Sequence, residues 1–240
     1  MTTMRHYSFF SFLILLFPTL SASAQTMPSI APTATYTNSE GNTQTETVIS
    51  ESAPLTVSFS SGAENTEGWI AHYEWRFYKE GTRDAPYLTR YDEETSYTFT
   101  EAGTHRVELW ATFIQGNDTI AYTNTYWTTD ASPLSITIAE SKLEMPNAFS
   151  PNGDGINDVY KAKDGWKSIV KFEAVIFNRW GQKLYSWTDP AGGWDGKFNG
   201  KDVKQGVYYV MVKAVGADGK KYNIKRDVNL LRGFTERTTP

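Results

Sequence analysis

Cysteine is absent from the 240-residue chain, so the protein has no disulfide, no thiol nucleophile and no cysteine ligand for a metal. Histidine is scarce as well, since only His72 and His105 lie outside the first few residues. Zinc sites and serine–histidine catalysis depend on these residue types, so the composition disfavours both. An enzyme built on this chain would have to work with carboxylates, and we expect a protein with no catalytic activity and no required cofactor.

Long apolar runs are also missing, apart from one at the N-terminus. Arg5 precedes the apolar residues 7–20, and Ala22-Ser23-Ala24 provides small residues in the spacing of a cleavage site. This pattern predicts a secretory signal peptide, residues 1–24, cut between Ala24 and Gln25. The run is shorter than the roughly 20 apolar residues of a membrane-spanning helix, so we expect the mature chain to be exported and soluble.

Charge of one sign dominates each half of the remaining chain. Residues 25–140 contain 16 acidic and 5 basic residues, whereas residues 141–240 contain 11 acidic and 17 basic residues. A change of sign between two segments of ordinary domain size predicts two domains, at 25–140 and 141–232, with a short tail at 233–240. The overall net charge of −4 lacks the basic excess of a nucleic-acid-binding protein, so we expect no nucleic-acid partner.

The acidic half shows apolar residues alternating with polar ones in several short segments. The turn "QGND" leads into one more expected strand, from Thr119, with Trp127 at its end. Short alternating strands separated by turn residues predict an antiparallel β-sandwich. In order, "PLTVSF", "YEWRF" and "YTFTEAGTHRVELWAT" resemble a PKD-type immunoglobulin-like module, although "YKEGTRDAPY" stands where that family has a Gly-Asp-Gly turn. The alternating segments are residues 53–61, 70–78, 96–100, 105–113 and 133–140.

The basic half predicts strands as well. Residues 169–187 indicate two strands around a turn at 178–181, residues 206–215 indicate a buried strand rich in β-branched and aromatic residues, and "GADG" leads into a last strand. The sequence therefore predicts an all-β protein: two Ig-like antiparallel β-sandwich domains in tandem after a cleaved signal peptide.

Five motifs in the basic half carry a more specific resemblance. "PNAFSPNGDGINDVY", "IFNRWGQKLY", "WDGKFNGK", "GVYYVMVKA" and "VNLLR" follow one another as in the gliding-motility-associated C-terminal domain, the type B sorting domain of the type IX secretion system of Bacteroidota. The resemblance covers roughly residues 143–232, and Arg226 and Asp227 stand where the family often has a glycine. It implies export across the outer membrane to the surface or medium, through the type IX machinery and an outer-membrane β-barrel of the PorP/SprF kind.

The same resemblance assigns a sorting motif to a set of residues in this half. They are Pro146, Asn147, Phe149, Ser150, Pro151, Asn152, Gly153, Asp154, Gly155, Asn157, Asp158, Asn178, Arg179, Trp180, Gly181, Trp194, Gly196, Gly206, Tyr208 and Arg232.

The stretch "NGDGIND", residues 152–158, has three interpretations. Asn152, Asp154, Asn157 and Asp158 offer oxygen ligands for calcium, but an EF-hand alignment puts Lys161 where the bidentate Glu belongs. Alternatively, the glycines allow tight turns while the Asn and Asp side chains accept hydrogen bonds from backbone N–H groups. The third interpretation is direct recognition by the secretion partner.

For the whole protein we expect an exported binding or structural module, or an accessory or sensing subunit of the secretion or envelope apparatus. Its ligand would be a cell-surface polysaccharide or protein. Two alternatives stay open. One is a small glycosidase using carboxylates such as Glu74 and Glu108, although strand alternation places both on a solvent face. The other is a carbohydrate-binding module with Trp69 or Trp127 as its platform.

Overall fold

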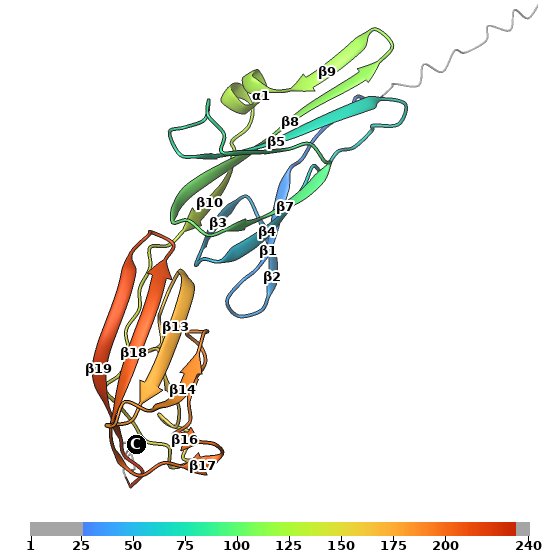
Figure 1. Cartoon of the computed structure of the whole chain (residues 1–240). Helices are drawn as coiled ribbons and strands as arrows, with labels where there is room; N and C mark the ends of the chain where they lie inside the picture. The colour runs from blue at the N-terminus through green and yellow to red at the C-terminus, as the bar shows by residue number, and fades with distance from the viewer. Residues whose placement is uncertain (1–25, 234–240) are drawn as a thin grey trace, which may run out of the picture.

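The computed structural model describes residues 26–233, so the signal peptide, its cleavage junction at Ala24 and Gln25, and residues 234–240 lie outside the described part. The chain is almost entirely β-structure, as the sequence predicts, and its sheets fall into two groups (Figure 1). Strand pairs are antiparallel except β3 with β10 and β11 with β19. No helix among residues 26–233 has the length and apolar character needed to cross a membrane.

The N-terminal sandwich packs two sheets face to face. Its first sheet has the order β2-β1-β4-β7, and its second has the order β3-β10-β8-β5-β6, with β9 also paired to β8. The first sheet is formed by β1 (Thr33–Thr37), β2 (Thr43–Glu46), β4 (Leu55–Ser60) and β7 (Glu94–Phe99). The second is formed by β3 (Val48–Glu51), β5 (Ile70–Lys79), β6 (Leu88–Arg90), β8 (Gly103–Gln115), β9 (Asp118–Tyr122) and β10 (Leu134–Ile138).

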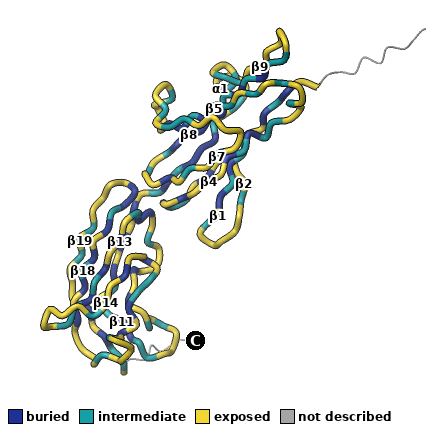
Figure 2. Tube along the Cα trace, turned by 45° about the vertical axis from the view of Figure 1, so that its right-hand side comes forward, coloured by how far each residue is buried: buried dark blue, intermediate teal, exposed yellow. Residues whose placement is uncertain are grey.

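Aromatic side chains fill the space between these two sheets. Trp75 and Phe77 of β5 are fully buried, and the ring of Phe59 lies 5.7 Å from Trp75 and 5.4 Å from Phe77. The alternation of β5 therefore points Trp75 into the core, where its indole N–H donates to the carbonyl of Asp92. Figure 2 shows buried and exposed positions alternating along these strands, the pattern of a sheet with one solvated face.

The expected strand over residues 119–129 is wrong in its second half. β9 ends at Tyr122, and α1 (Asn124–Thr129) follows as a single short helix. The helix places Trp127 against the core at 6% exposure, with its indole N–H donating to the carbonyl of Leu109. Burial of this one large side chain accounts for the change from strand to helix, because no alternation continues beyond Tyr122.

The C-terminal sandwich is less symmetric. One layer is a sheet of order β11-β19-β18-β13-β14, and the opposite layer consists of loops and two short ribbons, β12-β15 and β16-β17. Tyr160 and Trp194 project from the β12–β15 ribbon into the core, where both are fully buried. The sheet strands are β11 (Ala148–Phe149), β13 (Ile169–Phe177), β14 (Lys183–Trp187), β18 (Gly206–Gly216) and β19 (Lys221–Leu230). The ribbon strands are β12 (Tyr160–Lys161), β15 (Gly193–Trp194), β16 (Lys197–Phe198) and β17 (Lys201–Asp202).

The turn between β18 and β19 joins the two sandwiches. Ala217 is buried in the N-terminal core, and its carbonyl accepts a hydrogen bond of 3.0 Å from the N–H of Ala102. Beside it, the hydroxyl of Ser168, which has no exposed surface, accepts the N–H of Ala53 at 3.1 Å. Figure 1 shows this turn next to the N-terminal sandwich, with β16 and β17 at the opposite end. One backbone hydrogen bond, one hydrogen bond to the hydroxyl of Ser168 and an apolar contact thus hold the two sandwiches together.

Replacing Ala217 by aspartate is expected to open this joint without unfolding either sandwich. An unpaired carboxylate is strongly disfavoured in a buried position, whereas separation of the two sandwiches would return it to water. Small-angle scattering of the mature chain should show an increased maximum dimension. Lys220→Asp, which places the same carboxylate at an exposed position of the same turn, is the control. Unchanged scattering for Ala217→Asp would mean that the turn does not hold the two parts together.

Candidate functional site

The residues assigned to the sorting motif gather at one end of the C-terminal sandwich. We call this the distal end; it is formed by residues 150–158, 178–182 and 195–206 together with Arg232. The sheet register brings these segments together, because Phe177 at the end of β13 pairs with Tyr209 near the start of β18, and Gly206 pairs with Leu230 at the end of β19. The distal end lies opposite the joint with the N-terminal sandwich (Figure 1).

Asp158 organises the "NGDGIND" loop. Its Oδ1 accepts the backbone N–H groups of Asn152, at 3.0 Å, and Gly153, at 2.7 Å, while its Oδ2 accepts that of Gly155, at 2.8 Å. Gly153 and Gly155 have φ values of +82° and +84°, which side chains other than glycine rarely adopt. Hydrogen bonds from Gly153, then Gly155, then Asn152 hold the pKa of Asp158 below its ordinary value, because they stabilise the ionised carboxylate.

The side chains of Asn152 and Asp154 also form hydrogen bonds within the loop. Asp154 Oδ1 accepts the N–H of Ile156 at 2.9 Å, and its Oδ2 accepts the side-chain amide of Asn152 at 2.8 Å. The Oδ1 of Asn152 accepts the N–H of Asp154 in return. Among residues 26–233 there is no group of three or more acidic, His or Cys side chains placed to hold a metal ion. The hydrogen bonds that the loop forms are those of the structural interpretation, in which Asn and Asp side-chain oxygens accept backbone N–H groups.

Asp158→Asn is expected to loosen this loop. An amide group presents one acceptor oxygen instead of two, so at least one of the three N–H groups loses its partner. Hydrogen exchange should show lower protection factors at Gly153 and Gly155, with the strands of the main sheet unchanged. Because the folded-state pKa is depressed, the contribution of Asp158 is present above the unfolded pKa of about 3.9 and is lost as the pH falls through the lower folded value.

The wild-type loop should therefore approach the exchange pattern of the variant in strong acid. Asp164→Asn is the control, since Asp164 is almost fully exposed and forms only a 3.8 Å ion pair with Lys161. If Gly153 and Gly155 stay protected in Asp158→Asn, the carboxylate does not organise the loop.

Several motif residues turn out to be core residues. Phe149 and Trp194 are buried with their rings 5.4 Å apart, and Tyr208 packs 5.1 Å from Trp194 while its hydroxyl donates to the carbonyl of Lys204. Pro146 and Asn147 contribute through their backbones, because their carbonyls accept from the hydroxyl of Tyr160 and the N–H of Asn229. Phe149, Trp194 and Tyr208 thus support the distal end from the core, whereas Pro146 is partly buried and Asn147 is exposed.

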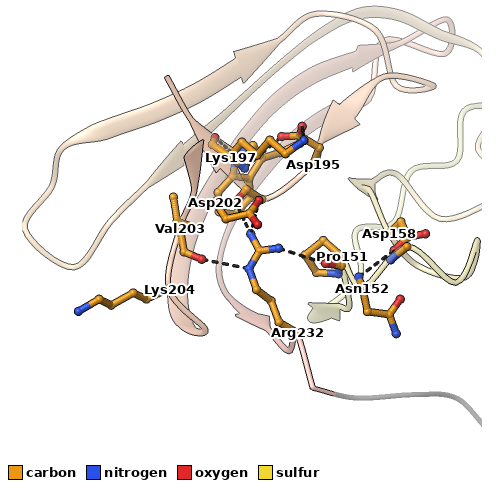
Figure 3. Close-up of polar contacts among 12 residues, drawn as sticks. Pro151, Asn152, Asp158, Asp195, Lys197, Asp202, Val203, Lys204 and Arg232 are labelled. Atoms are coloured by element: carbon orange, nitrogen blue, oxygen red, sulfur yellow. Dashed lines mark hydrogen bonds and ion pairs between the residues drawn. The ribbon is translucent and has the colours of Figure 1, made fainter. Parts of the chain in front are cut away.

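Arg232 connects three separate segments of the distal end (Figure 3). Its guanidinium donates to the carbonyls of Pro151 at 3.1 Å, Gly196 at 2.7 Å and Val203 at 3.1 Å. Asp202 lies 3.3 Å from the same group. Gly196 has a φ of +77°, and a Cβ at this position would come within 3.2 Å of both Arg232 and Leu230. A residue other than glycine at position 196 would therefore press on the guanidinium that holds the Gly196 carbonyl.

The turn after β13 presents two side chains to solvent. The Oδ1 of Asn178 accepts the N–H groups of Trp180, at 2.9 Å, and Gln182, at 3.1 Å, and Gly181 supplies a φ of +78°. This fixed turn leaves Trp180 78% exposed, with the guanidinium of Arg179 stacked 4.6 Å from its ring centre. A groove of about 440 Å³ runs from this turn to the residues leading into β18, among them Phe198, Val203 and Lys204.

The sequence interpretation missed an apolar surface beside this groove. β18 is only half buried, because Val207 and Tyr209 are exposed at 48% and 44% while Tyr208 and Val210 point inward. The buried strand expected over residues 206–215 is therefore buried on one face only. Apolar residues at consecutive positions signal burial on both faces, and the outer face here carries no covering layer within the described residues.

The candidate residues of the N-terminal sandwich do not form the sites that the sequence suggested. Glu108, expected on a solvent face, is 1% exposed, and its two oxygens accept four hydrogen bonds from Tyr78, Arg83 and Trp110. A carboxylate with four donors is not free to act as an acid or base with Glu74. Trp127 is buried and Trp69 is packed against the core, so neither forms an exposed platform.

Comparison with known proteins agrees with the motif pattern. Residues 143–227 match the family model described as the CHU_C type IX secretion signal domain. The resemblance read from the sequence is thereby confirmed for this segment, and Arg232 lies beyond the matched range. Such a domain implies export by the type IX secretion system to the cell surface or the extracellular space.

Two solved structures show limited similarity. One is dimeric latent PorU from Porphyromonas gingivalis, with 12% identity and a TM-score of 0.26 over 87% of this chain and 20% of PorU. The other comprises the FN1–FN3 domains of chicken CNTN1, with 9% identity and a TM-score of 0.28 over 75% of this chain and 62% of that one. This chain thus spans a small part of PorU and under two thirds of the CNTN1 fragment. No curated protein matches the chain.

Proposed function

We propose that the protein is a non-enzymatic exported protein whose C-terminal sandwich directs it through the type IX secretion system and whose PKD-like N-terminal sandwich is displayed outside the cell as a binding module. The match of residues 143–227 to a type IX secretion signal domain is the observation that carries this proposal. The predicted signal peptide would supply the first step, transfer across the inner membrane. A narrower form of the proposal is an accessory or sensing role in the secretion or envelope apparatus.

The distal end is the surface we assign to the secretion partner, an outer-membrane β-barrel of the PorP/SprF kind. Its loops are held by internal hydrogen bonds, so a partner meets a preformed surface and pays little ordering entropy. Arg179 and Trp180 project from this surface and are of the residue types that dominate binding energies at interfaces. The excess of basic residues in this half would favour an acidic partner surface.

The test is secretion of the full chain in a type IX-competent host and in the same host without the system. The full chain should reach the surface or medium only when the system is intact. Combined Arg179→Ala and Trp180→Ala should lower the exported amount by about an order of magnitude or more, because each such residue contributes about 2 kcal/mol at a typical hot spot. Stability should not change, since both side chains are exposed.

Tyr91→Ala is the matched control, because it removes an aromatic side chain that is 69% exposed on the N-terminal sandwich. Export that does not depend on the type IX system would refute the proposed route. Normal export of the double variant would leave the route intact but remove this surface from it.

A further inference from the structure

The outer face of the β5–β8 sheet contains a hollow that the proposed export function does not use. Its volume is about 400 Å³, within the range of roughly 300–1,000 Å³ typical of small-molecule sites. The register of β5 and β8 places His72 opposite Thr112 and Glu74 opposite Trp110 on this face. Tyr91, from the segment after β6, and Thr123, just before α1, complete the wall.

A buried network fixes the aromatic wall of the hollow. The indole N–H of Trp110 donates to Glu108 at 3.0 Å, and the guanidinium of Arg76 lies 4.0 Å from the centre of the Trp110 ring. The guanidinium of Arg83 donates to both oxygens of Glu108, at 2.6 and 3.0 Å, and also to the side chain of Asn124, the first residue of α1. Trp110 is therefore held in one orientation before any ligand arrives.

The rest of the lining has unused hydrogen-bonding groups. Within residues 26–233, the side chains of His72, Tyr91, Thr112 and Thr123 make no hydrogen bond, and Glu74 has only a 3.5 Å contact with Arg76. An imidazole, a phenol, two hydroxyls and a carboxylate oxygen thus converge on one hollow next to a fixed aromatic ring. Donors and acceptors of both kinds beside an apolar ring surface suit a ligand with many hydroxyl groups and an apolar C–H face.

The charges around the hollow favour a neutral ligand over an anionic or a cationic one. Both arginines near the hollow are already paired, Arg76 with Glu74 and Arg83 with Glu108, so neither is free for an anionic ligand. The excess of acidic residues in 25–140 would also repel a polyanion. Glu74 in turn has its charge offset by Arg76, which gives a cationic ligand no unpaired carboxylate to bind.

We propose that this hollow, lined by His72, Glu74, Tyr91, Trp110, Thr112 and Thr123, binds a neutral saccharide. The site differs from the Trp69 or Trp127 platform that the sequence suggested. Its biological use rests on the proposed display of the N-terminal sandwich outside the cell, but binding itself does not require export.

The experiment uses the purified mature chain, titrated by NMR and calorimetry with neutral disaccharides of glucose, galactose, mannose, xylose and N-acetylglucosamine, and with glucuronate and glucosamine disaccharides. We expect at least one neutral disaccharide to bind and to shift the Trp110 indole resonance. His72→Ala and Tyr91→Ala should weaken binding at least about tenfold each, whereas Ile70→Ala, an exposed neighbour on β5 outside the hollow, should not.

His72 and Tyr91 are solvent-exposed, so their replacement should leave the fold intact, which unchanged melting curves would verify. Trp110→Ala is less informative alone, because it leaves Glu108 with one donor fewer. The absence of binding by every neutral disaccharide, a preference for the charged ones, or unchanged affinity in both exposed variants would each overturn the proposal. None of these outcomes bears on type IX export, which the secretion test measures separately.

Discussion

Arg232→Ala is expected to reduce export to background while the N-terminal sandwich remains folded. The guanidinium donates to carbonyls of three segments, the loop at Pro151, the turn at Gly196 and Val203, the residue after β17. Loss of a charged donor that leaves a partly buried carbonyl without a partner costs about 2 kcal/mol. The hydrogen bond from the Val203 N–H to the Gly196 carbonyl would remain, but the loop at Pro151 would lose the guanidinium that ties it to these two segments. A partner would then no longer meet a preformed surface.

The measurement is the amount of full-length chain in the medium and on the surface, compared with the amount kept in the periplasm. Arg232→Lys should retain part of the export, because an ammonium group can donate to some of the three carbonyls but lacks the planar fork. Lys197→Ala is the control at the same end, since its 3.6 Å ion pair with Asp195 is exposed. Full export of Arg232→Ala, with the loops shown to be mobile by hydrogen exchange, would mean that sorting does not need the closed distal end.

The main strands could be predicted from sequence because alternation on one buried face is a local signal. The expected segments at 53–61, 70–78, 105–113 and 133–140 overlap β4, β5, β8 and β10 closely. The earlier strands β1, β2 and β3 were not predicted. "TATYT" and "TQTE" contain few apolar residues, so their place beside β4 depends on pairing with distant strands and not on local pattern.

For the candidate site, the sequence predicts the turns but not the hydrogen bonds that hold them. The density of Gly, Asn and Asp in residues 152–158 indicates turns, and the structure forms them, but it does not show which carboxylate accepts the backbone N–H groups. Asp158 does so because the loop folds back over six residues to reach it. For Glu108, alternation along the strand correctly predicts the outer face of the sheet. It does not predict burial, because the loop that carries Arg83 covers this part of the face.

Arg83→Met is expected to destabilise the N-terminal sandwich by about 3 kcal/mol at neutral pH, the lower end of the range for breaking a buried ion pair. Burial alone would raise the pKa of Glu108, but the hydrogen bonds from Arg83, Tyr78 and Trp110 outweigh burial and lower the pKa instead. Methionine keeps the length and apolar stem of the side chain and removes only the cation. The variant therefore leaves a buried carboxylate with two neutral donors.

The pH dependence identifies the cause. In the wild type, the depressed pKa of Glu108 gives stability that is present above the unfolded pKa of about 4.3 and is lost as the pH falls through the folded value. The variant loses this term, so the difference in free energy of unfolding should be largest near pH 7 and shrink below about pH 4, where a protonated Glu108 needs no cation. Urea unfolding followed by tryptophan fluorescence at several pH values measures the difference.

Two further variants separate the ion pair from general packing. Adding Glu108→Gln to Arg83→Met should recover part of the lost stability, because a neutral amide no longer requires a cation. Lys79→Met, which breaks the exposed 2.6 Å ion pair with Glu101, should cost less than about 1 kcal/mol. If Arg83→Met costs no more than Lys79→Met at neutral pH, Glu108 must be reached by water. The network that fixes Trp110 would then give the saccharide hollow no rigid wall, so this stability measurement also tests a premise of the binding proposal.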